Sequence, residues 1–428
     1  MAGERYVLLG LAPARAEWFA AVARWATAAS IPAEFVKCVS AEQVRARLAS
    51  GRAFSALLVD GDAPALDRDL LAAAGRARCA VVVVDGNRPG RDWPGLGAAA
   101  VLPRRFGPEQ LVEVLVAGAR LISSGASAVV VDPPAPVAAG PTAWVAACCG
   151  PGGTGASTVA IALAQGLARE HGGVLLADFA RHAEQAVLHD AGDIVPGVQE
   201  LVDAHRTRRP SPAEVRSLAF AVHERGYDLL LGLRRSRAWS VLRPQSVAGG
   251  FEGLGRAYRH VVVDTDTDLE GEPDGGSADV EDRNVLARTA VSGAHVVFAV
   301  GVPGVKGAHS LVRVLNELCD FGVPADRVVP VVNRAPRHPR ARAEVAATVT
   351  RLAPPGVRQA VCLADRPVDE LLRHGARLPI GLTQPLVRAH AGALAALEPL
   401  GPRVRAPGVS QPERIAPGSL GSWEEDAG

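Results

Sequence analysis

Short apolar runs alternate with segments of helical spacing over the first 120 or so residues. The runs predict five buried strands, at 6–11, 35–39, 54–60, 80–85 and 99–102. Between and after them, apolar positions recur at helical intervals, which predicts helices over 14–29, 41–50 and 109–122, the last preceded by Pro108 at its first turn. Alternation of this kind is typical of a parallel sheet covered by helices on both faces. We therefore predict a doubly wound α/β domain over 1–122.

The composition changes after this domain. Residues 123–142 are rich in proline and alanine, which predicts a stiff linker. The strand and helix alternation resumes at Ala143 and continues to about Leu397, so a second, doubly wound and mostly parallel α/β domain is assigned to 143–400. The last stretch, 401–428, has a proline about every five residues and no apolar periodicity, and it is interpreted as a disordered tail that cannot form an amphipathic membrane helix.

Charge and cysteine usage narrow the classes of function. The chain has 46 basic and 45 acidic residues, a formal net charge of +1, which argues against a broadly basic nucleic-acid-binding surface. Only Lys37 and Lys306 are lysines, and the six cysteines form no C-x-x-C pair, so neither a zinc site nor a disulfide framework is indicated. No apolar run approaches the ~18 residues that a membrane span needs. We expect a cytosolic protein, recruited to septum, pole or membrane-associated machinery through its partners.

A glycine-rich loop carries the main chemical signal. The apolar run 144–149 enters the segment 150–158, and an amphipathic helix follows to Glu170. The candidate ligand-binding residues of this loop are Gly150, Gly152, Gly153, Thr154, Gly155, Ala156, Ser157 and Thr158. Their spacing matches the phosphate-binding pattern G-x-x-x-x-G-K-[ST] except that Ala156 replaces the lysine, while Ser157 stands where a hydroxyl would bind Mg²⁺. The alternative is a glycine-rich turn with no ligand.

These residues resemble the loop of the MinD/ParA-type deviant Walker-A ATPases. The resemblance is closest to the CpaE/TadZ branch, including actinobacterial CpaE-like septum site-determining proteins, in which a receiver-like domain precedes a MinD-like domain. The family loop reads K-G-G-x-G-K-[ST], and here Pro151 and Ala156 occupy the two lysine positions.

Other segments match the family in order. The run 174–180 resembles its second strand, with Asp178 as the first aspartate, a candidate cofactor-binding residue, and Ala180 in place of the second. The run 260–264 resembles the Walker-B strand, whose aspartate, here Asp264, holds Mg²⁺ through water. The resemblance also assigns Asn333, after the strand 328–332, to the adenine edge. It thus implies ATP or ADP with Mg²⁺ on Ser157 and Asp264, and the sequence leaves open whether the altered loop still binds them.

The departures from the family pattern point to weak catalysis. Phosphoryl transfer depends on positioned charges, and losing one such donor typically costs about 10²–10³ in rate. Two lysines and one aspartate are missing, so our first hypothesis is a regulator with little or no ATP hydrolysis that positions septum formation or Tad-type pilus and secretion assembly through protein partners.

Two other functions stay open. One is an active ATPase that cycles between monomer and ATP-bound homodimer, with Arg181 or Lys306 replacing the lost cations, although both fit solvated surface residues better. The other is a ParA-like DNA partition protein, which the near-neutral charge disfavours. The arginines 334, 337, 340 and 342 with His338 suggest contact with an acidic partner, phosphate or DNA, the alternative being a solvated loop.

The first domain resembles a receiver, a flavodoxin-like fold, in one respect. Asp60 ends its third strand, where receivers place their phospho-acceptor. The acidic pair after the first strand and the lysine after the fifth are both missing, so little would hold Mg²⁺. We interpret Asp60 as a structural residue in a pseudo-receiver that serves as a docking surface.

Overall fold

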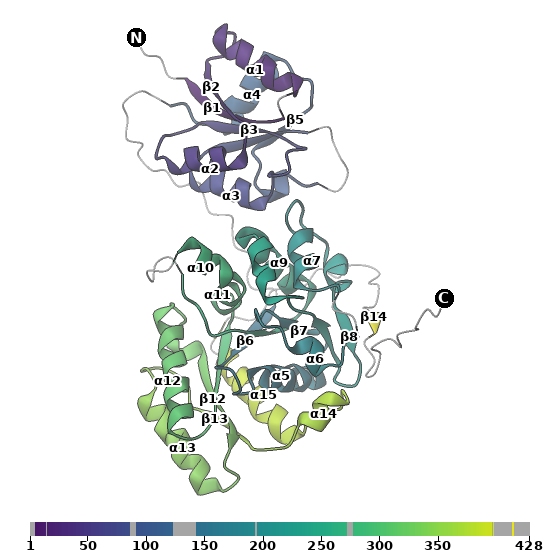
Figure 1. Ribbon diagram of the computed structural model, residues 1–428, viewed down its shortest axis with the longest axis vertical. Helices are drawn as coiled ribbons and strands as arrows, with labels where there is room; N and C mark the ends of the chain where they lie inside the picture. Colours follow the sequence, from purple (N-terminus) through teal and green to yellow (C-terminus); the bar gives the residue numbers. More distant parts are fainter. Residues whose placement is uncertain are drawn as a thin grey trace, which may run out of the picture. The chain divides into compact units, whose positions relative to one another are not determined.

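The computed structural model describes residues 5–13, 15–85, 91–122, 143–192, 195–271, 277–395, 397 and 413–414. The chain divides into two compact units, one of Met1–Val137 with Asp203–Arg209 and the other of Ala138–Val202 with Pro210–Gly428. Figure 1 shows the elements of both.

The first unit contains a five-stranded parallel sheet in the order β2-β1-β3-β4-β5. Its strands are β1 (Tyr6–Leu11), β2 (Ala33–Cys38), β3 (Ala56–Asp60), β4 (Ala80–Val84) and β5 (Ala100–Leu102). Its helices are α1 (Glu17–Thr27), α2 (Ala41–Ala49), α3 (Arg68–Arg76) and α4 (Pro108–Gly118), with a short 3₁₀ helix at Pro94–Leu96. This strand order is one of the two common doubly wound arrangements, the flavodoxin-like one. The predicted strands and helices agree with it, with ends shifted by a few residues.

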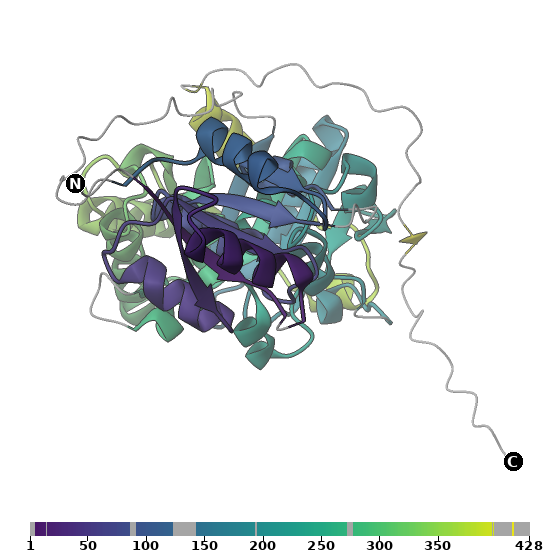
Figure 2. The same ribbon diagram turned by 90° about the horizontal axis from the view of Figure 1, so that it is seen from above.

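Both faces of this sheet are covered by helices. Side chains of α1 and α4 pack with Leu8, Leu58 and other residues on one face, and side chains of α2 and α3 pack with Leu9 and Leu57 on the other. Figure 2, which looks from above, shows the purple α1 ribbon over the sheet. Since alternate residues of β1 and β3 enter different clusters, continuous apolar strands satisfy both faces at once.

The second unit contains a nine-stranded sheet in the order β13-β12-β11-β6-β10-β7-β9-β8-β14. The strands are β6 (Trp144–Cys149), β7 (Val174–Asp178), β8 (Phe220–Val222), β9 (Tyr227–Leu230), β10 (His260–Thr265), β11 (Val296–Gly301), β12 (Val328–Ala335), β13 (Val361–Ala364) and β14 (Glu413–Arg414). Among the described strands of this sheet, β8 and β9 pair antiparallel and the other pairs are parallel. The prediction of a mostly parallel α/β sheet is therefore confirmed.

Helices again cover both faces. They are α5 (Ala156–Glu170), α6 (Gln185–Leu188), α7 (Val198–Ala204), α8 (Pro212–Arg216), α9 (Pro244–Ala257), α10 (Ala278–Arg283), α11 (Val285–Ser292), α12 (Val305–Asp320), α13 (Pro339–Leu352), α14 (Asp369–Arg373) and α15 (Ile380–Leu394), with 3₁₀ helices at Ser236–Val241 and Ala325–Arg327. Helices α5, α14 and α15 pack on one face, and α7, α8, α9, α11, α12 and α13 pack on the other. Strand β6 is buried on both sides, because Ala146 and Cys148 face α5 while Ala147 and Cys149 face the opposite cluster.

The predicted linker and the predicted tail lie mostly outside the described residues. The predicted linker 123–142 lies outside them completely, and so does the tail 401–428 except for Glu413–Arg414. Glu413–Arg414 pair with β8. The linker and the disordered tail stay predictions. Within the described part of the chain, no helix is both long and apolar enough to cross a bilayer.

Candidate functional site

The loop between β6 and α5 leaves the carboxyl end of a central strand. The Thr154 hydroxyl donates to the Pro151 carbonyl at 2.7 Å, and the Thr154 N–H approaches the same oxygen at 3.1 Å. Gly153 and Gly155 take the left-handed conformation, with φ of 81° and 84°. The glycines therefore allow a closed turn that would strain other residues, as the sequence pattern predicts.

The glycines serve two different purposes. A Cβ at Gly150 would lie 2.5 Å from the Val300 carbonyl oxygen, so this position needs glycine for packing. At Gly152 and Gly153 a Cβ would meet nothing within 4 Å, so the outer side of the loop is open. The N-cap of α5 is Gly155, which makes no side-chain cap bond, and no side chain of the described residues is seen to cap the first turn. An open loop at an uncapped N-terminus is suited to an anion.

Asn333 and Arg334, at the end of β12, both donate hydrogen bonds to the loop. Asn333 Nδ2 donates to the Thr154 carbonyl at 2.9 Å, and Arg334 Nη1 donates to the Gly153 carbonyl at 3.2 Å. Arg334 has a φ of 53°, and its own N–H donates to Asn333 Oδ1 at 3.0 Å. The assignment of Asn333 to an adenine edge stays a prediction, since in this structure its amide is bonded to the chain itself.

Ser157 and Asp264, the predicted metal-binding pair, lie near each other, and the Ser157 side chain lowers the pKa of the Asp264 carboxyl. Gln185 Nε2 donates to Asp264 Oδ2 at 2.7 Å and approaches the Ser157 carbonyl at 3.4 Å. The sheet brings Asp264 beside Asp178, because β10 pairs with β7 in the register that aligns these two residues.

Asp178 fixes the segment that follows β7. Its Oδ1 accepts from the Ala180 N–H at 3.1 Å and its Oδ2 accepts from the Gln185 N–H at 2.9 Å. Both carboxylate oxygens are thus used to shape the turn into α6. The structure therefore gives Asp178 a supporting role, and its predicted part in cofactor binding stays a prediction.

Burial governs the ionisation of both aspartates. Burial raises the pKa of Asp264 to about 6, against the lowering effect of its hydrogen bonds to Gln185 and Ser157. Burial and then the neighbouring Asp264 charge raise the pKa of Asp178 well above its usual range, although two backbone N–H groups oppose this. Charge is therefore costly here, which is typical of a buried carboxylate pair.

Mg²⁺ needs several oxygen ligands at short distance and keeps bound waters. Here the Gln185 amide already donates to Asp264 Oδ2. No three His, Cys, Asp or Glu side chains among the described residues form a metal-binding group. In this arrangement the residues do not fit Mg²⁺ unless Gln185 moves.

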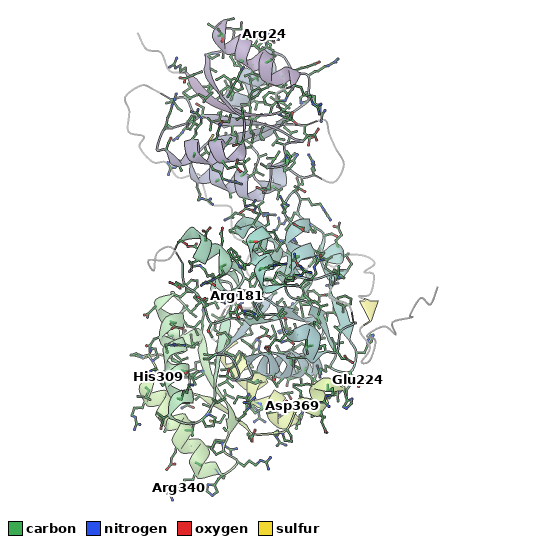
Figure 3. All side chains as sticks on the ribbon, viewed as in Figure 1. Arg24, Arg181, Glu224, His309, Arg340 and Asp369 are labelled. Carbon is green, nitrogen blue, oxygen red and sulfur yellow. The ribbon has the colours of Figure 1, made fainter. Side chains whose placement is uncertain are left out.

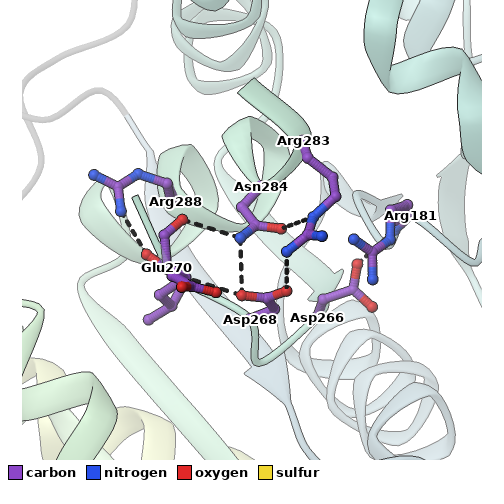
Figure 4. A network of polar contacts seen from close by, with 8 residues as sticks. Arg181, Asp266, Asp268, Glu270, Arg283, Asn284 and Arg288 are labelled. Atoms are coloured by element: carbon purple, nitrogen blue, oxygen red, sulfur yellow. Dashed lines mark hydrogen bonds and ion pairs between the residues drawn. The ribbon is translucent and has the colours of Figure 1, made fainter. Parts of the chain in front are cut away.

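A polar network fixes the segment after β10 (Figure 4). Asp268 accepts from Arg283 at 3.1 Å and from Asn284 at 2.8 Å, and the same Asn284 amide donates to the Glu270 carbonyl at 3.0 Å. Asp266 accepts from the Arg181 N–H at 2.7 Å. Two acidic residues that follow Asp264 are therefore bonded to neighbouring segments, which holds the end of β10 in place.

The cations considered from the sequence lie in different places. Arg181 lies beside Asp266 in Figure 4, and Lys306 is exposed in the first turn of α12. Arg334 is the member of the arginine cluster that contacts the loop. Sequence reasoning missed Gln185 and the loop contact of Arg334. The Asn333-Arg334 pair at a strand end was a signal for Arg334, whereas no spacing rule pointed to Gln185.

Three other residues, Asp60, Cys148 and Cys149, are explained by their structural surroundings. Asp60 accepts from Trp18 Nε1 at 2.9 Å through one oxygen and from the Asp62 N–H at 2.9 Å through the other. Cys148 and Cys149 are buried in β6, and burial raises the pKa of the Cys149 thiol to about 12. These contacts agree with the interpretation of all three as structural residues.

No protein-family model matches the sequence, and no curated protein matches it. The chain is similar to solved structures of low sequence identity. A ParA family ATPase from Chlorobium tepidum is 14% identical, with 58% of this chain and 98% of that one covered, at a TM-score of 0.46. MinD from Pyrococcus horikoshii, a septum site-determining protein complexed with Mg-ADP, is 15% identical over 60% and 96%, at a TM-score of 0.45. The MinC:MinD cell division complex of Aquifex aeolicus gives 18% identity over 61% and 99%, at a TM-score of 0.44.

Proposed function

We propose that the chain is a nucleotide-binding regulator of the MinD/ParA type, whose loop 150–158 binds ATP or ADP with little or no hydrolysis. The observation that carries the proposal is the loop itself: left-handed glycines, an open outer side and an uncapped helix start, all at the carboxyl end of β6. Backbone N–H groups in such a position attract phosphate.

The sheet topology supports this location. Strands β7, β8 and β9 lie on one side of β6, and β11, β12 and β13 lie on the other. The chain thus reverses its course beside β6, and open α/β sheets bind ligands outside the carboxyl ends of strands at such a reversal. The site residues proposed for the nucleotide are therefore those of the loop, with Asp264 and Asn333 beside them.

The chemistry of the loop supports binding without turnover. Pro151 lacks an N–H, and Ala156 carries no charge where the resemblance places a lysine. Removing one preorganised donor costs about 10²–10³ in rate, so several absent groups leave little hydrolysis.

The finer part of the proposal concerns the role in the cell. We assign the chain to the CpaE/TadZ-like branch, near the CpaE-like septum site-determining proteins, and infer that it positions septum formation or a Tad-type pilus or secretion assembly. Its first unit, with the flavodoxin-like strand order, would act as a docking surface for protein partners, because both oxygens of Asp60 already have partners inside the chain.

The test is binding and turnover by the purified full chain. Titration with fluorescent ATP and ADP should show saturable binding, and Mg-ATP turnover should equal that of an Asp264→Ala control. Restoring both lysines with Pro151→Lys and Ala156→Lys should tighten ATP binding, since each adds a cation beside the phosphates. Steady hydrolysis that Asp264→Ala abolishes would show an active ATPase instead.

A further inference from the structure

On the side of loop 150–158 where Asp264 lies, the amide of Gln185 covers the carboxylate. Gln185 is fully buried, at 0% exposure, and its Nε2 lies 2.7 Å from Asp264 Oδ2. The chain itself therefore supplies a donor to Asp264, where a hydrated cation would otherwise have to bind.

The same amide has an oxygen with no partner. Gln185 Oε1 is buried and accepts no hydrogen bond from any described residue. It belongs to the amide that lies between Asp264 and the first turn of α5. A buried acceptor without a donor is costly, so this oxygen points to a donor that the chain does not supply, such as a ligand group or its bound water.

The positive charge lies on the opposite side of the loop. Arg334 is exposed, and its Nη1 donates to the Gly153 carbonyl at 3.2 Å. Its left-handed backbone, with φ of 53°, and the Asn333 bond to Thr154 keep this strand end against the loop. A guanidinium has five N–H donors, so one bond to the loop leaves donors for a phosphate.

Together these contacts bear on whether a metal ion accompanies the nucleotide in the loop. We propose that loop 150–158 takes its nucleotide polyphosphate without a metal ion, with the Gln185 amide on Asp264 in place of the cation and the Arg334 guanidinium as the counter-charge. The inference rests on the proposed nucleotide binding and specifies how the charge of the polyphosphate is balanced there.

The first measurement compares wild-type binding of ATP and of ADP, by calorimetry on the full chain, in Mg²⁺ and in excess EDTA. The two dissociation constants should agree within about twofold for each nucleotide, since a difference of that size is small beside one lost charged hydrogen bond. Binding that is about tenfold tighter in Mg²⁺ would overturn the inference.

The second measurement removes the counter-charge. Arg334→Ala should weaken ATP binding by roughly tenfold or more in EDTA, as expected for a lost hydrogen bond to a charged group, and Arg334→Lys should retain part of the affinity. Arg340→Ala is the matched control, because Arg340 is an exposed arginine in the first turn of α13 (Figure 3). An Arg334→Ala protein that binds as tightly as the control would overturn the role of Arg334.

The third measurement removes the Gln185 amide from Asp264. Gln185→Ala removes the amide but keeps the backbone N–H that Asp178 accepts, so ATP binding should become tighter in Mg²⁺ than in EDTA. Metal dependence unchanged from wild type would contradict the role of the amide. If Gln185→Ala prevents folding, the wild-type comparison of Mg²⁺ with EDTA and the Arg334 variants still test the inference.

The outcomes separate the inference from the proposed function. Absence of nucleotide binding in both Mg²⁺ and EDTA would refute the proposed function. Binding in Mg²⁺ alone would refute the metal-free state and leave nucleotide binding in place.

Discussion

Gly155 lies against the Asn333 amide where the loop enters α5. A Cβ at this position would lie 2.5 Å from Asn333 Nδ2, and the φ of 84° disfavours any other residue. The same amide nitrogen holds the Thr154 carbonyl at 2.9 Å. Glycine at this position therefore permits a contact between segments far apart in the chain, in addition to the turn that the sequence pattern indicates.

Individual side chains of the site could be foreseen only in part. Ser157 and Asp264 were predicted to work together because each follows a recognisable local pattern, and the Ser157 side chain lies near enough to lower the pKa of Asp264. Their binding of a metal stays a prediction. The Gln185 contact with Asp264 joins residues 79 positions apart, and the Asn333 contact with Thr154 joins residues 179 apart. Local spacing carries no information on such pairs, since they depend on how the strands are ordered in the sheet.

A buried histidine gives a prediction for pH at the scale of one residue. His189 lies between the Gln185 carbonyl, 2.8 Å from Nδ1, and the Tyr227 hydroxyl, 2.6 Å from Nε2. The carbonyl can only accept, so Nδ1 carries a hydrogen. Burial, and then the Arg225 charge, lower the pKa of His189 from 6.5 to about 3.

The free energy of unfolding should fall as the pH falls from 6.5 towards 3, because over this range the unfolded chain binds a proton that the folded chain does not. The contribution of His189 is on the order of 1 kcal/mol per pH unit. Denaturant unfolding at a series of pH values should show a shallower slope for His189→Gln than for wild type. His309→Gln, at an exposed position labelled in Figure 3, should leave the slope unchanged. Parallel profiles for His189→Gln and wild type would contradict the assignment.

At the scale of elements, the sequence was most informative where a segment is buried on both sides. The apolar runs that became β1, β6 and β10 were identified because a central parallel strand needs continuous apolar residues. Short elements such as α6 and the edge pair β8 and β14 were not foreseen, since they depend on contacts with other segments. Which elements each helix packs against could likewise not be predicted, because the topology sets the partner of each apolar face.

The packing of α5 on α15 gives a prediction at this scale. A Cβ on Gly166 of α5 would lie 2.5 Å from Val387 Cγ2 and 3.3 Å from the Thr383 carbonyl oxygen. Gly166→Ala should therefore destabilise the protein by about 1–3 kcal/mol through overpacking. Gly392, in the exposed part of α15, has nothing within 4 Å, so Gly392→Ala should stabilise by about 0.5–1 kcal/mol through helix propensity. Urea midpoints that shift in the same direction for both variants would show that the two helices do not approach so closely.

At the scale of the whole molecule, the chain has separate apolar cores in its two units. Two clusters draw their residues from the five-stranded sheet and its helices, and two others draw theirs from the nine-stranded sheet and its helices. The composition of 123–142 predicts a stiff linker between two domains, and this linker stays a prediction. The candidate site lies within the second unit, which contains the loop 150–158, Asp264 and Asn333.

This division predicts how the full chain should melt. Each unit with its own core is expected to unfold as a separate cooperative transition, so calorimetry should resolve two. ATP in excess should raise the temperature of one transition and leave the other in place, because a ligand stabilises the unit that binds it. Leu58 has 0% exposure in the first unit, so Leu58→Ala should destabilise that unit by about 2–5 kcal/mol. It should lower the temperature of that unit's transition only. If ATP and Leu58→Ala both shift the same transition, the nucleotide site and the first core unfold together, and the loop is then not confined to the unit to which we assign it.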